Sequence, residues 1–160
     1  MAKIKYTKTE LKAQTDALRR FQRFLPMLQL KKQQLQAEIA AINGHLAKVQ
    51  ARETAARKRL EVWVRLFADA DNIADLALLE QVVTEAGNIA GLPIPLYRDV
   101  NVKRRPLDLF VTPPWYDDAQ ESIAEILALR AEGAVLERQR ELVEAELLTT
   151  SQRVNLFEKI

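Results

Sequence analysis

The residues of this chain that could do chemistry are few and widely separated. The 160-residue sequence has one histidine, His45, and no cysteine, so it offers neither a histidine pair nor a thiolate to hold a metal ion. It contains no glycine-rich phosphate-binding loop followed by Lys and Ser or Thr, and no Gly-x-Ser-x-Gly nucleophile motif. We therefore predict no catalytic, cofactor-binding or metal-binding residue, and we interpret His45 as a surface side chain.

A cluster of glutamates is the nearest approach to an acid and base pair. Glu137, Glu141 and Glu144 would crowd one arc of a helix. Arg138 and Arg140 lie among them, and mixed charges of this kind are typical of a solvated helix face. We favour the solvated face over a catalytic pair.

The basic run "VKRRP" at residues 102–106 could contact nucleic acid. The whole chain, however, carries a formal net charge of only +2, which argues against bulk attraction to DNA or to an anionic membrane. No apolar run approaches the roughly 18 residues that span a bilayer. The opening "MAKIKYTKTE" also lacks the hydrophobic stretch of a signal peptide. We expect no nucleic-acid partner and no membrane insertion.

The small net charge conceals a strong asymmetry between the two parts of the chain. Residues 1–60 carry +10 and residues 61–160 carry −8. Opposite charges of this size should attract each other across a fold that brings the two parts together.

A seven-residue repeat dominates the first part of the sequence. Two series, starting at Leu11 and at Gln14, are apolar at fifteen of eighteen positions as far as Ala70. Because a straight helix drifts about 20° per heptad, such a repeat predicts a helix that supercoils about a partner. We expect this helix over residues 7–70, a rod on the order of 95 Å long. Pro26 lies inside it, either as a tolerated kink or as a functional bend.

A weaker repeat follows in the last part of the chain. Seven of ten seam positions from Ile126 to Phe157 are apolar, and strong helix formers surround them. We expect a helix over 119–160 that pairs antiparallel with the first one, which would leave about 22 residues of the first helix without a partner at its N-terminal end.

The connection between the two helices collects five of the six prolines. Helix cannot persist through it. "IADLALLEQVVTEAG" predicts a short helix that ends at Gly87, "LPIPLYRDVNV" and "LDLFV" predict short strands, and "KRRP" predicts the turn between them. The predicted connection therefore contains a short helix and a β-hairpin, forms a cap at one end of the rod, and folds back over the end of the first helix near "EVWVRLF".

The predicted fold is all-α, a long antiparallel two-helix coiled coil with a small connecting cap. We expect the whole chain, 1–160, to form one domain, with the first helix at 7–70, the cap at 71–118 and the second helix at 119–160. Asp117 and Asp118 are placed to cap the second helix.

Several segments carry a resemblance to a known family. They are "YTKTELK", "LPMLQLKKQQLQ", "NIAGLPIPLYRDV", "LFVTPPWYDD" and "RVNLFEK". In this order they resemble the D subunit, the central-stalk rotor subunit of bacterial V-type (A/V-type) ATPases, along nearly the whole chain. "RVNLFEK" matches the family pattern of Arg-Val-Asn, two hydrophobic residues and Glu. In the family the chain continues as helix past this motif, whereas here it stops three residues after Phe157.

The resemblance implies a non-catalytic shaft that transmits torque between ATP hydrolysis or synthesis in a soluble head and ion translocation in a membrane ring. It implies several partners: the catalytic and regulatory subunits of the head, the small F subunit of the stalk and a funnel-shaped subunit on the membrane side. It implies a cytoplasmic protein, peripheral to the membrane, without a cofactor.

The expected partner-contact residues lie at the two ends of the rod. They are Leu11, Leu18, Phe21, Leu25 and Leu28 on the first helix, Leu109, Phe110, Trp115 and Tyr116 in the connection, and Arg153 and Asn155 in the last motif. The aromatic side chains of the connection could equally pin the cap onto the rod. The main alternative function is a free-standing coiled-coil scaffold or adaptor.

Overall fold

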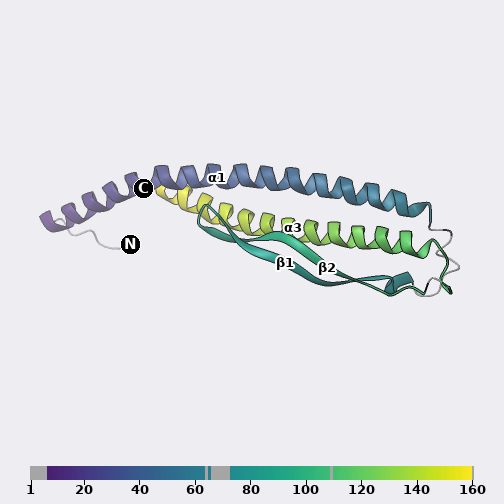
Figure 1. The fold of residues 1–160 in the computed structure, drawn as a ribbon. Helices are drawn as coiled ribbons and strands as arrows, with labels where there is room; N and C mark the ends of the chain where they lie inside the picture. The colour runs from purple at the N-terminus through teal and green to yellow at the C-terminus, as the bar shows by residue number, and fades with distance from the viewer. Residues whose placement is uncertain (1–6, 64, 66–72, 109, 160) are drawn as a thin grey trace.

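A computed structural model shows two long helices and a β-hairpin (Figure 1). It describes residues 7–63, 65, 73–108 and 110–159. The elements are helix α1 (Lys8–Glu61), a 3₁₀ turn η1 (Ile73–Asp75), strands β1 (Ala77–Ile89) and β2 (Leu92–Arg104), and helix α3 (Tyr116–Glu158). The rod and the connection are confirmed, but the architecture is not all-α, because the connection contains two strands of 13 residues each.

Helix α1 begins with a local sequence signal. Thr7 is its N-cap, and the Thr7 hydroxyl accepts a hydrogen bond of 3.2 Å from the backbone N–H of Glu10. The helix continues through Pro26 and ends at Glu61, earlier than the predicted residue 70. Most of the predicted continuation, at 64 and 66–70, lies outside the described residues.

The two helices run antiparallel. Arg59 of α1 pairs with Glu125 near the start of α3 at 2.8 Å, and Gln29 donates to Glu158 at the end of α3 at 3.2 Å. All buried residues of α1 lie on the two predicted heptad series: Leu35, Ile42, Leu46, Val49 and Ala56. The antiparallel pairing and the seam of α1 are therefore confirmed, whereas supercoiling stays a prediction.

The charge asymmetry appears as ion pairs between the helices. In three of them the cation belongs to α1 and the carboxylate to α3: Lys31 with Glu146, Arg52 with Glu132 and Arg59 with Glu125. Glu53 and Arg130 form a pair of the opposite sense. The predicted attraction between the two parts of the chain is thus realised along the helix interface.

The segment predicted as a short helix is strand β1. Its leucines, glutamates and alanines favour helix locally, but Val82 and Val83 have β-branched side chains suited to a strand. β1 pairs antiparallel with β2, with Val82 opposite Val100, and the ladder shifts register twice. Tertiary pairing therefore overrides a local preference that was nearly balanced.

The turn of the hairpin is at Ala90 and Gly91, not at "KRRP" as predicted. Both residues have positive φ, 49° and 84°, which is the geometry of a two-residue turn that follows strand twist. The Asn88 side chain accepts a 2.9 Å hydrogen bond from the N–H of Gly91. Lys103 and Arg104, from the predicted turn, belong to β2 instead.

The hairpin lies along α3 and is not a cap at one end of the rod (Figure 1). Ile94 of β2 shares one core cluster with Leu35 and Ile42 of α1 and Val143 of α3. Helix α3 consequently buries side chains on two sides, one toward α1 and one toward the hairpin. This is why its buried residues spread beyond its predicted seam to Ala131, Val135 and Gln139.

Helix α3 starts at Tyr116, three residues before the predicted position. Asp117 and Asp118 lie in its first turn, where carboxylates favour the positive end of the helix dipole. Neither of them is the N-cap. That position is held by Trp115, whose indole has no acceptor oxygen for a capping bond.

Candidate partner-binding surfaces

The predicted apolar stripe of α1 is partly covered by the end of α3. Phe21 stacks on Phe157, with ring centroids 5.1 Å apart, and both side chains are partly buried. Leu25 and Leu28 are also partly buried. The partnerless part of α1 is therefore shorter than the predicted 22 residues, because pairing with α3 already begins at Phe21.

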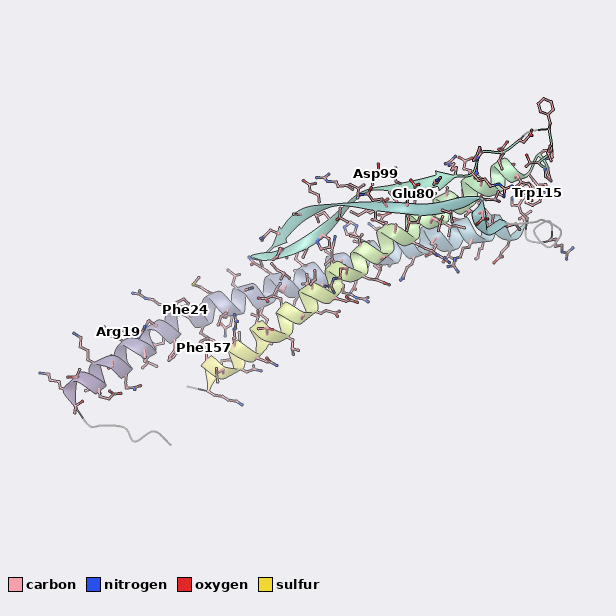
Figure 2. All side chains as sticks on the ribbon, turned by 90° about the horizontal axis from the view of Figure 1, so that it is seen from below. Arg19, Phe24, Glu80, Asp99, Trp115 and Phe157 are labelled. Atoms are coloured by element: carbon pink, nitrogen blue, oxygen red, sulfur yellow. The ribbon has the colours of Figure 1, made fainter. Side chains whose placement is uncertain are left out.

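Before Phe21, α1 continues without α3 beside it (Figure 1). Leu11 is 69% exposed and Leu18 is 46% exposed. Arg19, which Figure 2 places on this part of the helix, is also exposed. This end of the rod thus presents apolar and basic side chains together.

A second apolar surface on α1 was not predicted. It consists of Phe24, Met27 and Leu30, each more than half exposed, and it borders a shallow hollow of about 380 Å³ beside the hairpin turn at Ala90. These residues lie outside both heptad series, so a search for seams passes over them. The sequence nevertheless carried a sign of this surface, because large apolar side chains occupy helix positions that do not face α3.

The opposite end of the rod presents a loop between β2 and α3. Asp108 organises it: its carboxylate accepts from the N–H of Phe110 at 3.0 Å, and its carbonyl oxygen accepts from the N–H groups of Val111 at 3.1 Å and Thr112 at 2.8 Å. The Phe110 side chain is fully exposed and that of Val111 is 80% exposed. "LDLFV" therefore forms a turn in its described residues and not the predicted strand. Leu109 lies outside the described residues.

Trp115 and Tyr116 lie at the start of α3, at the end of the helix opposite to Phe157 (Figure 2). Their rings are 4.6 Å apart between centroids. Tyr116 is only 7% exposed and packs in a cluster with Leu76 and Ala119, which Trp115 also contacts. Of the aromatic residues predicted as contacts, Phe110 is presented outward, whereas Tyr116 belongs to the core of the connection.

Arg153 and Asn155, from the "RVNLFEK" motif, are exposed on the last turns of α3. Val154 between them is 3% exposed and faces the seam. The structure does not bring these two residues together with the loop at Asp108, because they lie near the other end of α3.

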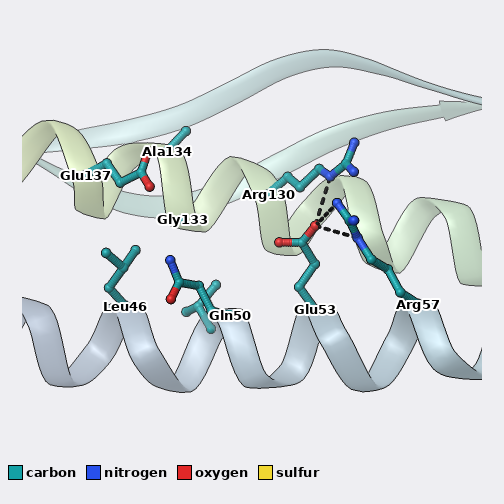
Figure 3. A pocket seen from close by; sticks show the side chains of 9 residues that line it. Leu46, Gln50, Glu53, Arg57, Arg130, Gly133, Ala134 and Glu137 are labelled. Carbon is teal, nitrogen blue, oxygen red and sulfur yellow. Dashed lines mark hydrogen bonds and ion pairs between the residues drawn. The ribbon is translucent and has the colours of Figure 1, made fainter.

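A polar groove of about 270 Å³ opens between α1 and α3 where Gly133 leaves space (Figure 3). Glu53 accepts hydrogen bonds from the Nε atoms of Arg130 at 2.9 Å and Arg57 at 3.0 Å. The bond from Arg130, with that from Arg57, lowers the pKa of Glu53 below its ordinary value. A carboxylate held by two guanidinium groups is a weak base, so we interpret the groove as a tie between the helices.

His45 lies on another groove, together with Tyr97 and Glu132. Burial raises the pKa of Tyr97, and the charges of Glu132 and Asp99 add to that effect.

Within the described ranges, no group of three or more His, Cys, Asp and Glu side chains is arranged to hold a metal ion. Among the same residues, neither long helix has an apolar stretch that could cross a bilayer.

Comparison with known proteins gives a consistent result. Residues 10–160 match the family model described as the D subunit of ATP synthase. The chain is 37% identical to the V-type ATP synthase D subunit of Borreliella burgdorferi over 160 residues, which are all of this chain and 79% of the relative. It is 30% identical to the protein of that name from Chlamydia pneumoniae over 98% of this chain and 76% of the relative, and 32% identical to the one from Chlamydia caviae over 99% and 77%.

The chain belongs to the ATP synthase D-subunit family.

Three motifs that carried the resemblance can now be placed on the fold of this family member. "NIAGLPIPLYRDV" forms the turn of the hairpin and most of β2. "LFVTPPWYDD" contains the exposed loop tip and the start of α3, and "RVNLFEK" forms the end of α3. The motifs therefore fall on the hairpin and on both ends of α3.

Proposed function

We propose that this chain is the central-stalk shaft of a V-type rotary ATPase, a non-catalytic subunit that transmits torque between a soluble head and a membrane ring. Membership of the D-subunit family supports its place in such a complex. The observation that carries the mechanical part is that exposed apolar side chains lie at both ends of the rod. Leu11 and Leu18 are near the start of α1, and Phe110 and Val111 are in the loop before α3 at the other end.

The dimensions of the rod suit this role. Helix α1 has 54 residues and is therefore about 80 Å long at the usual rise per residue. Torque can be carried over that distance only if the two helices do not slide, and the seam and the ion pairs between them oppose sliding. Supercoiling of the pair, which we also propose, would add resistance to bending.

The partners follow from the chemistry of the two ends. The head, made of catalytic and regulatory subunits, would surround the N-terminal part of α1, where apolar and basic side chains are exposed. The small F subunit of the stalk and the membrane-side funnel subunit would hold the end that carries Phe110. In this account the chain works at the cytoplasmic face, peripheral to the membrane, and nucleotide binds only to its partners.

The segment "PLDLFVTPPWYDD" is the coupling element of this account. Its prolines restrict the backbone before binding, which lowers the ordering cost of docking. Phe110 and Val111 supply apolar area that the rod itself leaves exposed. Tyr116 serves the fold, so replacing Trp115 and Tyr116 together by alanine would test folding as much as coupling.

The experiment is therefore Phe110→Ala with Val111→Ala in a reconstituted complex. We expect the chain to fold normally, the soluble head to hydrolyse ATP, and ATP-driven ion pumping to fall. The matched control is Val83→Thr, which changes a half-exposed apolar residue in the middle of the hairpin and should pump normally. Normal pumping by the double variant would show that this loop is not the coupling.

The second candidate is a free-standing scaffold that binds a partner through the apolar surface of Phe24, Met27 and Leu30. It is favoured by the size of that surface alone. Purification of the chain from its native cells separates the two functions. A shaft should bring the catalytic and regulatory subunits with it in fixed stoichiometry, whereas a scaffold should not.

A further inference from the structure

The hairpin is fastened to α3 by two buried glutamines. The Gln120 side-chain amide donates to the carbonyl oxygens of Leu76 at 2.8 Å and Arg105 at 2.7 Å, at the base of the hairpin. The Gln139 amide donates to the carbonyl oxygen of Pro95 at 2.6 Å, near the turn. The two glutamines are 8% and 6% exposed and lie roughly 28 Å apart along α3 at the usual helical rise.

The same hairpin also contacts α1. Ile94, one residue before Pro95, is 4% exposed and packs with Leu35 of α1 and Val143 of α3 in one cluster. Near the turn of the hairpin, β2 is therefore bonded to α3 through Gln139 and packed against both helices through Ile94. Farther toward the N-terminus of α1, the rod consists of the two helices and then of α1 alone (Figure 1).

A third element of this kind changes how a pair of helices responds to torque. Two helices joined by one narrow seam yield when their side chains slide past one another. A strand ribbon that lies along α3 and also packs against α1 in the cluster around Ile94 must deform there before the helices can slide, because packed interiors have low compressibility. This packing also stabilises the hairpin, because an isolated two-stranded hairpin is at best marginally stable.

We infer that the β1–β2 hairpin acts as a splint, an added element that prevents α1 and α3 from sliding past each other. Ile94 makes the contact with both helices, and the side-chain amides of Gln120 and Gln139 hold the hairpin on α3. The splint itself is a property of the isolated chain. Its effect on coupling rests on the proposed function. The three residues act as positioning residues, and none of them needs to touch a partner.

The test uses the absence of cysteine from the chain. Ala37 and Ala145 are exposed, and each lies two residues beyond one of the clustered pair Leu35 and Val143. With both alanines changed to cysteine and spin-labelled, the full chain should give a narrow distribution of distances between the labels. We expect Ile94→Ala and the milder Gln139→Leu to broaden this distribution, and the surface control Val83→Thr to leave it unchanged.

Hydrogen exchange gives a second measurement on the same variants. Amide exchange at residues 30–45 and 135–150 should rise by roughly tenfold or more in Ile94→Ala, because loss of a buried side chain lowers the cost of local opening. A narrow distance distribution and unchanged exchange in both Ile94→Ala and Gln139→Leu would overturn the splint.

A rescue arm separates a splint from a docking surface. In the reconstituted complex, Ile94→Ala should reduce the number of ions pumped per ATP. A thiol cross-link between cysteines at positions 31 and 146, whose side chains form an ion pair between the two helices, should restore it. The cross-linked chain with Ile94 intact is the control. Failure of rescue, with normal pumping in that control, would mean that the hairpin acts through a partner. Failure of the unaltered chain to join the head would instead refute the proposed function.

Discussion

Phe21 and Phe157 stack with their ring planes inclined by 39°, and this contact marks the level at which α3 ends beside α1. Beyond it, α1 has no helix of this chain to pack against over residues 8–20, within the part of the chain that the structure describes. An apolar helical stretch without a partner is either unstable or prone to association.

The first prediction follows from that contact. In the isolated chain, amides of residues 8–20 should exchange at least as fast as an unprotected helix end, whereas those of residues 35–56 should be strongly protected. Replacing Leu11 and Leu18 by glutamine should reduce any self-association without lowering the melting temperature. Equal protection of the two regions in a proven monomer would contradict this.

A second prediction concerns Glu53, which ties Arg130 of α3 to α1. Glu53→Gln should lower the free energy of unfolding by about 1 kcal/mol or less at neutral pH, because the ion pairs are partly solvated. The pKa of Glu53 is lowered from 4.5, so the stabilisation is complete above that value and is lost as the pH falls through the lowered pKa. The free energies of unfolding of the unaltered chain and of Glu53→Gln, measured by denaturant titration, should therefore become equal in acid. A difference that persists at pH values well below 4 would exclude the charge as its cause.

At Thr150 we predict that a substitution increases the stability of the chain. Its side chain is 1% exposed, and its hydroxyl has no hydrogen-bond partner among the described residues. Thr150→Val should raise the free energy of unfolding by about 1 kcal/mol, since it removes a buried unpaired hydroxyl and keeps the shape. The control is Thr149→Val, because the Thr149 hydroxyl donates to the carbonyl of Ala145 at 3.1 Å. The idea fails if Thr149→Val stabilises as much.

Two glycines should respond differently to alanine. Gly44 lies within α1 with nothing near the position of an added Cβ, so Gly44→Ala should stabilise by up to about 1 kcal/mol. At Gly87 of β1 the added Cβ would lie 2.7 Å from the Cγ atom of Leu96, so Gly87→Ala should destabilise the hairpin. Melting temperatures of the two variants give the comparison, and a shift of the same sign in both would be inconsistent with these contacts.

The rod could be predicted from the sequence because its signal is periodic. Leu35 and Val49 are buried on the seam that the heptads indicate, and the charges of the two parts of the chain meet as expected. The hairpin was harder to predict, since β1 mixes helix-forming residues with Val82 and Val83, and the partners of these two valines are more than ten residues away.

The position of the hairpin was beyond sequence reasoning for another reason. It depends on Gln120 and Gln139, two polar residues that are buried because backbone carbonyls of the connection accept from them. Glutamine is mostly exposed in proteins, so neither residue gives a local sign of burial. The prolines around Phe110 excluded helix there, but "LDLFV" was predicted as a strand, and the turn that Asp108 builds was not predicted.

Rotation of the chain inside the head is the measurement that tests the central claim most directly. Val62, beside the end of α1 and 76% exposed, can be changed to cysteine in this cysteine-free chain and linked to a bead, with the head fixed to a surface. The account predicts that ATP drives the bead in continuous rotation of one direction, and that rotation stops when ATP is withdrawn. A bead that stays fixed relative to a head that is hydrolysing ATP would contradict it.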